Sequence, residues 1–599
     1  MGLFTHNNVV NINIGNNVTY KNNSMYNLFA NCNIFNQPVN IPNGITNISS
    51  AFYYCNNFNQ SINLPNSIID MSKIFYTCWN FNQPINIPSS VKNMASAFYL
   101  CELFNQQINI PNNVTDMFGS FSHCYNFNQP INISNGVANM SCIFDSCYNF
   151  NQPINIPNGV ADMSSAFAEC RNFNHPINIP SGVADVGGIF KLCNKFNQSV
   201  NIPSSVKSVS GAFMYCNSLN KPINIHSDVA SMSRLFQGCS NFNQPIKMPN
   251  VVTTLSEAFD GCIQFNQPVN INGDSASMYR AFYQCKNLNQ PVNITGTITN
   301  MYYAFYQCSN LNYPINIPDG VTDIIGTFRG CLNFNQPISI PNSVTNLTST
   351  FAECLNFNQP ISIPNSVTSM WSTFANCRPF NQPVNIPNGV TDMYSTFSGC
   401  NNFNQYVNIP NCVVNMCDTF SGCYNFNQSI DVPNSVRSMC NTFIYCSNFN
   451  QPVNIQNGVT NMCNTFMGCI KFNQPVSIPN SANVITNLFA YCTNFNQPVN
   501  IPFKVNVLAN VFCNCHAMSS DIRIYSNNVY SASNFLAGRQ LASPRLNIFV
   551  LAGGRTNKSI ANNKARYTIV YNAITWTADT ANTCYYNTEY NIYVYYNLV

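Results

Sequence analysis

The feature that most constrains this 599-residue chain is a cysteine at every 23rd position. The series begins at Cys32 and Cys55 and continues to Cys515 without an insertion or a deletion, giving 22 members. A fixed period of roughly 20 to 50 residues is typical of solenoids, in which each repeat forms one coil that buries its apolar face against its neighbours. The chain is therefore predicted to be a repeat array rather than several independent domains.

Each repeat has the same apolar skeleton. A Phe stands three residues before every cysteine of the series, and Met, Ile, Leu or Val stands four residues before that Phe. After the cysteine come a Phe or Leu and then an I-N-I segment, such as residues 85–87, whose period of two predicts a short strand with one buried face. From the next Val to the cysteine the apolar spacing is three, four and three, which predicts a short helical segment. The expected fold class is an α/β solenoid with one short parallel strand and one short helical segment per coil.

Polar residues and prolines recur at particular positions of the repeat. The residue before the Met position is Asp, Asn, Ser or Thr in 19 of the 21 copies from Asn47 onward, which predicts a side-chain cap on the first amides of the helical segment. Proline often precedes or follows the I-N-I segment, as Pro38 and Pro42 do. Because proline cannot donate a backbone hydrogen bond, the strands are predicted to be only two or three residues long.

The cysteines of the series all share one slot of the repeat. We interpret them as buried free thiols that fill a fixed place in the core, with disulfides or a metal ladder as the alternatives. Only five histidines exist in the chain, so no metal site is predicted. A second series, Cys417, Cys440 and Cys463, also has a spacing of 23 and is placed on the helical side, where disulfide pairing remains open.

The unit resembles the 23-residue leucine-rich repeat of the Treponema pallidum or bacterial-surface-protein-A-like (BspA-like) type. That family has the pattern C-x-x-L-x-x-I-x-L-P-x-x-L-x-x-I-x-x-x-A-F-x-x-C, and its slots are occupied here by Cys55, Phe58, Ile62, Leu64, Pro65, Ile68, Met71, Phe75 and Cys78. Phe replaces the first Leu and Met replaces the second Ile. The resemblance covers residues 25–518 and implies surface display and adhesion, with no fixed ligand.

Two rows of asparagines are candidates for function. The middle residue of I-N-I is Asn in 16 of 21 copies and is expected to face outward, where many weak hydrogen bonds could hold a glycan. The alternative is that these amides only keep the strand face soluble. The candidate concave-face binding residues are Asn40, Asn63, Asn86, Lys247, Asp431, Tyr313 and Tyr406. The Asn that follows the Phe after each cysteine, such as Asn36 or Asn59, is interpreted as a buried structural ladder, with sugar binding as the alternative.

Composition excludes several classes of function. Only 7% of the residues are charged and the net charge is +4, so no nucleic-acid partner is predicted. No apolar run approaches the roughly 18 residues of a spanning helix, so no membrane insertion is predicted. No catalytic, phosphate-binding or dinucleotide motif is present, so we expect neither an enzyme nor a cofactor.

The two ends depart from the repeat. We expect an N-terminal cap with an irregular first coil at 1–24, the 22 repeats at 25–518, degenerate coils at 519–550 and a β-rich cap or attachment domain at 551–599. The last 80 residues carry seven basic and three acidic side chains, and the candidate attachment residues are Arg555, Lys558, Lys564 and Arg566. This end resembles the ends of gut bacteriophage repeat proteins.

These observations predict a surface-exposed binding scaffold. The chain begins without the basic and apolar regions of a secretory signal. This favours a fibre or decoration protein of a bacteriophage virion that binds a host cell-surface glycan or protein through the solenoid and attaches to other virion proteins through its C-terminal end. The alternative is a cell-surface adhesin of a bacterium or a protist, which binds host proteins. Both place the protein outside the cell.

Overall fold

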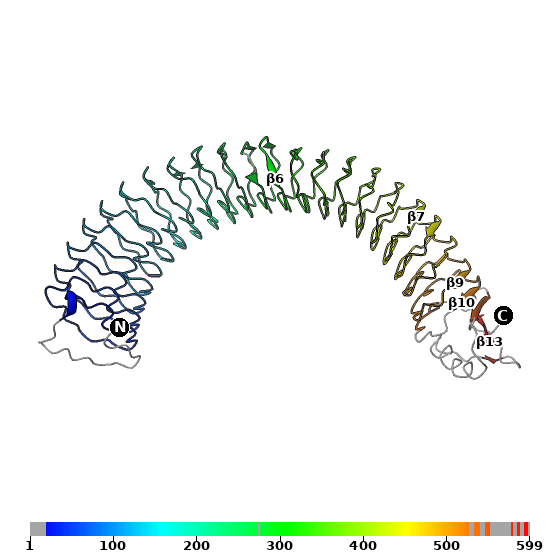
Figure 1. The fold of residues 1–599 in the computed structure, drawn as a ribbon, viewed down its shortest axis with the longest axis horizontal. Coiled ribbons are helices and arrows are strands. Elements are labelled where there is room, and N and C mark those ends of the chain that lie inside the picture. Colours follow the sequence, from blue (N-terminus) through cyan, green and yellow to red (C-terminus); the bar gives the residue numbers. More distant parts are fainter. Residues whose placement is uncertain are drawn as a thin grey trace. The chain divides into compact units, whose positions relative to one another are not determined.

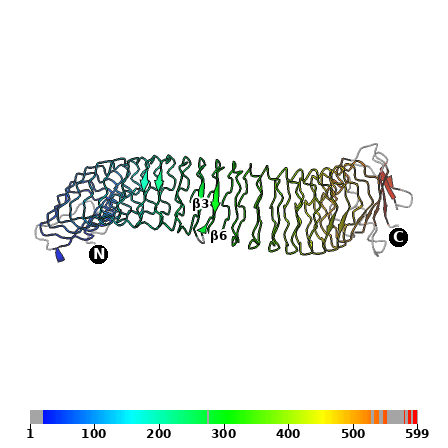
Figure 2. The same cartoon turned by 90° about the horizontal axis from the view of Figure 1, so that it is seen from above.

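The computed structural model describes residues 20–273, 276–525, 532–538, 545–550, 577–578, 584–587 and 592–596. The chain divides into two compact units, Met1–Asn300 and Met301–Val599. Within each unit, successive coils lie side by side and repeat the same path (Figures 1 and 2). The predicted solenoid is therefore confirmed. Most of the predicted N-terminal cap and the candidate attachment residues Arg555, Lys558, Lys564 and Arg566 lie outside the described residues.

The strands are short, as the prolines predicted. The first unit contains β1 (Val200–Asn201), β2 (Ile223–Asn224), β3 (Val269–Ile271), β4 (Ala276–Ser277), β5 (Val292–Ile294) and β6 (Ile298–Asn300). The second contains β7 (Ile430–Val432), β8 (Val453–Ile455), β9 (Val499–Ile501), β10 (Ile522–Ile524), β11 (Leu546–Val550), β12 (Thr577–Ala578), β13 (Cys584–Asn587) and β14 (Ile592–Tyr596). Strands of neighbouring coils pair in parallel with a step of one repeat, so that Val269 faces Val292. The outer residues of β3, β5, β7, β8 and β9 are buried and the middle one is exposed, as the period of two predicted.

The strand pattern changes at the C-terminal end. Strand β10 keeps the step of one repeat to β9, because Ile522 faces Val499. On its other side Ile522 faces Ile548 of β11, so the step there is longer than one repeat. Strand β14 then adds to β11 in parallel, and β13 and β12 follow in antiparallel order. Strands β12, β13 and β14 lie within residues 551–599, the region for which the sequence predicts β-rich structure.

The predicted helical segment is wrong. In the coil that ends at Cys78, the amide of Cys78 donates to the carbonyl of Phe75 at 2.9 Å, which closes a turn of four residues. The amide of Lys73, in the same segment, donates instead to Ala95 of the next coil at 2.8 Å. Because alternate amides bond to the neighbouring coil, no i to i−4 ladder can form. Among the described residues the one helical element is the short 3-10 helix η1 (Lys21–Asn23).

Overlapping turns require left-handed backbone at two places in every coil. Lys73 has φ of 53° and Thr77 has φ of 63°, and the equivalent residues of the other coils repeat these values. Most of these residues are not glycine, although a side chain in this conformation costs about 1–2 kcal/mol. The hydrogen bonds between coils hold the backbone in this form.

We expect Lys73→Gly to be better tolerated than Lys92→Gly. Both lysines are exposed and their amides bond to a neighbouring coil, but only Lys73 has a positive φ. In regular backbone, glycine lowers the stability of the folded state by roughly 0.5–1 kcal/mol. At a left-handed position such as Lys73 it also removes the steric penalty that a side chain imposes. Chemical denaturation should show K73G to be more stable than K92G by at least about 0.5 kcal/mol. An equal loss of stability in both variants would contradict this account.

The polar residue before the Met position caps a turn rather than a helix. The Oδ1 of Asn47 accepts a hydrogen bond from the amide of Ser49 at 2.8 Å, and Asp70 does the same for Ser72 at 2.9 Å. The capping interaction was therefore correctly predicted, but the capped segment is a turn and not the predicted helix. The same residues form single parallel bridges between coils, as between Asn47 and Asp70.

The core of each unit is built from ladders of identical side chains. The ring of Phe52 lies 4.3 Å from Phe58, on the other side of Cys55, and 5.7 Å from Phe75, its equivalent in the next coil. The core thiols also have a polar role, because Cys78 Sγ donates to the carbonyl of Phe52 at 3.0 Å and this bond recurs from coil to coil. Burial raises the pKa of Cys78 and its equivalents, which keeps these thiols protonated as donors.

Candidate functional site

An open groove of about 940 Å³ crosses several coils of the first unit. It is lined by two parallel rows of residues that flank the buried Phe after each core cysteine. One row stands directly after that Phe and the other directly before it. The lining residues are Asn82, Asn105, Asn128, Asn151 and Asn174 in the first row and Leu103, Asn126, Asn149, Asn172 and Lys195 in the second.

The first row, which we call the inner amide row, is fixed by the backbone of the next coil. The Oδ1 of Asn82 accepts hydrogen bonds from the amide of Asn105 at 2.9 Å and from Gln106 Nε2 at 3.1 Å. The Oδ1 of Asn105 accepts from the amide of Asn128 in the same way. The predicted structural ladder is thus confirmed for the acceptor atom. It is not fully buried, however, and the Nδ2 donors of Asn82, Asn105 and Asn128 have no partner among the described residues.

The second row, which we call the outer amide row, is held by its own side chains. Asn149 Nδ2 donates to Asn126 Oδ1 at 3.3 Å, and Asn172 Nδ2 donates to Asn149 Oδ1 at 3.4 Å. These three amides are exposed. An apolar residue, Leu103, replaces the amide at one end and a cationic one, Lys195, replaces it at the other. The groove therefore offers donors and acceptors along its length and one positive charge at its end.

The floor between the two rows is rigid. Phe127 stands between Asn126 and Asn128 in the sequence and is fully buried, and its ring stacks on that of Phe150 at 5.9 Å. Close-packed ladders of this kind leave the lining amides little freedom to rearrange. A ligand would consequently meet an array of amides that is already in place.

The residues predicted as a binding face are exposed and are divided between the two units. Asn40, Asn63, Asn86 and Lys247 lie in the outward row of the strand segments in the first unit. In the second unit, Asp431 is the exposed middle residue of β7, and Tyr313 and Tyr406 are exposed.

Sequence reasoning missed the outer amide row. The available signal was the recurring N-F-N segment, in which an amide stands on both sides of a buried Phe.

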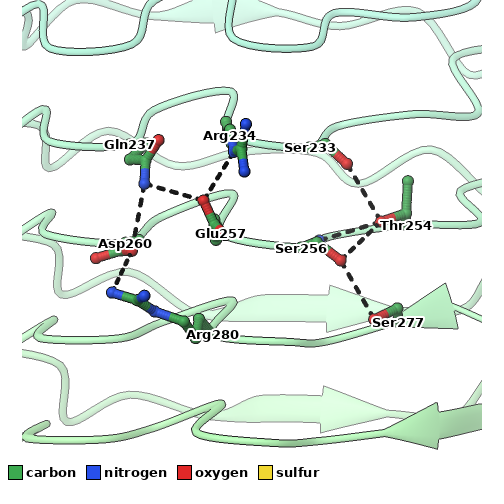
Figure 3. A network of polar contacts seen from close by, with 9 residues as sticks. All are labelled: Ser233, Arg234, Gln237, Thr254, Ser256, Glu257, Asp260, Ser277 and Arg280. Atoms are coloured by element: carbon green, nitrogen blue, oxygen red, sulfur yellow. Dashed lines mark hydrogen bonds and ion pairs between the residues drawn. The ribbon is translucent and has the colours of Figure 1, made fainter.

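A second polar cluster of the first unit is internally neutralised (Figure 3). Arg234 Nε lies 2.8 Å from Glu257 Oε2, and Arg280 lies 3.0 Å from Asp260 Oδ2. Gln237 donates to both carboxylates at 3.0 and 3.4 Å. Burial raises the pKa of Asp260, and the Arg280 charge opposes that rise. Beside this cluster, hydroxyl groups bond from coil to coil through Thr254. Each of the two carboxylates is paired with an arginine of a neighbouring coil. The cluster therefore joins coils by ion pairs.

Within the described ranges, no group of three or more His, Cys, Asp or Glu side chains is arranged to hold a metal ion. The same part of the chain has no helix that is long and apolar enough to cross a membrane.

Comparison with known proteins gives a family and two solved structures. The family model described as "Mycoplasma protein of unknown function, DUF285" matches overlapping segments at 1–64, 24–133, 69–178, 132–225, 157–247, 207–317, 276–386, 299–409, 386–457 and 455–542. A leucine-rich repeat protein from Bacteroides ovatus is 18% identical over 58% of this chain and 86% of its own, with a TM-score of 0.35. A leucine-rich cell surface protein from Faecalibacterium prausnitzii is 21% identical over 58% of this chain and 88% of its own, with a TM-score of 0.30. No curated protein gives a significant match. The family matches together span most of the chain, which therefore belongs to the DUF285 family of BspA-like repeat proteins.

Proposed function

We propose that the protein is a non-enzymatic binding scaffold whose amide groove, residues 82–195, binds an unbranched neutral glycan of a cell surface. The observation that carries the proposal is the row of Nδ2 donors that have no partner among the described residues, repeated once per coil along an open groove. Each donor belongs to an amide whose oxygen is already held by the next coil. The row therefore keeps its direction without a ligand, which lowers the entropy cost of binding.

The chemistry of the groove fits hydroxyl groups. Amides donate and accept hydrogen bonds and carry no charge, so they match the hydroxyl groups of a neutral sugar. Coils joined by backbone hydrogen bonds lie about 4.8 Å apart, a spacing similar to the length of one sugar residue in an extended chain. Consecutive sugars could then meet consecutive coils, and weak contacts would add up along the groove. Leu103 offers an apolar contact to the C–H face of a sugar at one end.

Exchanging asparagine for aspartate separates binding from folding. Asn105→Asp with Asn151→Asp keeps the oxygens that accept the amides of the following coils, but removes two Nδ2 donors of the groove. The matched control is Asn335→Asp with Asn381→Asp, which changes the same ladder positions in the second unit. On an array of linear neutral glucans, mannans and galactans, we expect the groove variant to bind at least about tenfold more weakly than the control. A tenfold loss of affinity corresponds to roughly 1.4 kcal/mol of binding free energy.

Thermal unfolding of both variants should remain similar, since both keep the acceptor ladder. If wild-type protein binds none of these glycans, or if both variants lose binding equally, the groove is not the glycan site.

We also propose that the scaffold is displayed on a bacteriophage virion and held there through its C-terminal end, with a bacterial or protist cell-surface adhesin as the alternative. Support for attachment comes from the basic residues near Arg555 and Arg566 and from the strands β11 to β14, which continue the strand stack beyond the repeats. Immunogold labelling with an antibody against residues 20–525 decides between the two. Labelled virions support the first proposal, and labelled cell envelopes without labelled virions overturn it.

A further inference from the structure

Three thiols lie outside the core series at one position of three successive coils. Cys417, Cys440 and Cys463 each follow a buried core methionine in the second unit and are half-buried. The core cysteines of the same coils, such as Cys423, are fully buried and donate to backbone carbonyls. The two sets of thiols therefore differ in access to solvent while sharing the same coils.

Backbone hydrogen bonds bring the three thiols side by side. The amide of Asp418 donates to the carbonyl of Cys440 at 2.9 Å, and the amide of Asn441 donates to the carbonyl of Cys463 at 2.9 Å. Chains joined in this way lie about 4.8 Å apart, within the roughly 4.4–6.8 Å between Cα atoms that a disulfide spans. Cys417 Sγ donates a hydrogen bond to Ser438 Oγ, two residues before Cys440 in the next coil, at 2.9 Å.

The thiols differ in their readiness to react. The hydrogen bond with Cys440 lowers the pKa of Cys463 to about 7, so that much of it is thiolate at neutral pH. Burial raises the pKa of the core thiols Cys423 and Cys446, which keeps them protonated. The side chains around the row include Asp418, whose pKa burial raises, and the amides of Asn441 and Asn464, which bond to each other at 2.8 Å.

We propose that Cys417, Cys440 and Cys463 form a thiol–disulfide exchange site whose substrate is a low-molecular-mass disulfide, and that exchange leaves a disulfide between Cys440 and Cys463. The Cys463 thiolate attacks one sulfur of the disulfide RSSR, whose S–S bond breaks and releases one thiolate that takes up a proton. Cys440 then loses its proton and attacks Cys463 Sγ, which breaks the mixed disulfide and releases the second RSH. Two protein thiols are oxidised and one RSSR is reduced to two RSH.

The product crosslinks two neighbouring coils. It leaves Cys417 as a thiol beside Cys440, where it can attack the new disulfide and move the crosslink by one coil. A covalent bond between coils restrains the local opening to which repeat proteins are prone, because each repeat contacts only its neighbours.

The folded full-length protein, treated with oxidised glutathione and mapped by mass spectrometry after alkylation, tests the proposal. We expect a peptide crosslinked through Cys440 and Cys463. The exposed Cys412 is an internal control, since it shares no row with the other thiols. It should keep a glutathione adduct. Cys440→Ser should stop the reaction at an adduct on Cys463, whereas Cys417→Ser should leave the crosslink unchanged.

Two results would overturn the proposal. One is a Cys412 adduct with no crosslink from Cys440 to either Cys463 or Cys417. The other is a Cys440→Ser variant, folded by circular dichroism, that carries no adduct on Cys463 under conditions that modify Cys412.

Discussion

Replacement of Phe420 by Ala should destabilise its part of the second unit by about 3–5 kcal/mol, the usual cost of removing a buried Phe. Phe420 is fully buried, and its ring stacks at 5.7 Å on both Phe397 and Phe443, the equivalent residues of the two neighbouring coils. It also packs at 4.4 Å on Phe426 of its own coil. The substitution therefore opens a gap in one ladder and removes a contact of the second.

The loss should be local. In a solenoid, stability is approximately a sum over repeats and their nearest interfaces, so a break weakens the coils on either side first. Hydrogen exchange should show lower protection from Phe397 to Phe443 and unchanged protection between residues 52 and 190. Tyr424→Ala is the control, because this aromatic side chain is 49% exposed and has no ring contact in the described part of the chain. A uniform loss of protection, or an equal loss in the control, would contradict the ladder account.

The repeat and its core could be predicted from the sequence because both depend on periodicity. Phe52, Cys55 and Phe58 recur at fixed spacing, and side chains that recur in every coil must stack on their own copies. The alternation of I-N-I likewise gave the buried and exposed faces of the strands.

The backbone between Met71 and Cys78 could not be predicted in the same way. The spacing of Met71, Phe75 and Cys78 fits a helix, but it also fits overlapping turns, because both return the chain to the core after three or four residues. One sequence signal did distinguish them. Gly326 and Gly330 occupy the two left-handed positions of one coil, whereas glycine is unfavourable in the interior of a helix.

The groove could be predicted only in part. The inner amide row was predicted as a buried structural ladder, since a recurring Asn must satisfy backbone groups in a repeated turn. Its free donors depend on how each amide is oriented, which residue types alone do not reveal. Lys247 and Asp431 were predicted as binding residues because they replace the usual Asn by a charged side chain. They belong to different units of the structure.

Gly458→Ala should lower the free energy of unfolding by about 1–3 kcal/mol, the usual loss when an extra group is forced into a packed site. Gly389→Ala should leave the free energy of unfolding nearly unchanged. Both glycines stand directly before the core Val, and neither has a positive φ, so the difference is steric. A Cβ on Gly458 would overlap the carbonyl oxygen of Asn434, and it would lie 2.5 Å from Arg437 Nη1 and 2.8 Å from the Asn434 carbonyl carbon. A Cβ on Gly389 would have its nearest neighbour, the Val367 oxygen, at 3.5 Å.

The cause of the crowding at Gly458 provides a second test. Arg437 Nη1 donates to the Asn434 carbonyl at 2.6 Å and holds it near Gly458, while the coil of Gly389 has Thr368 in place of the arginine. Arg437→Thr should therefore recover part of the stability lost in Gly458→Ala, and a double-mutant cycle by chemical denaturation measures that coupling. If the two glycine variants are equally stable, or if the arginine substitution adds independently to the loss, the carbonyl held by Arg437 is not what requires glycine at this position.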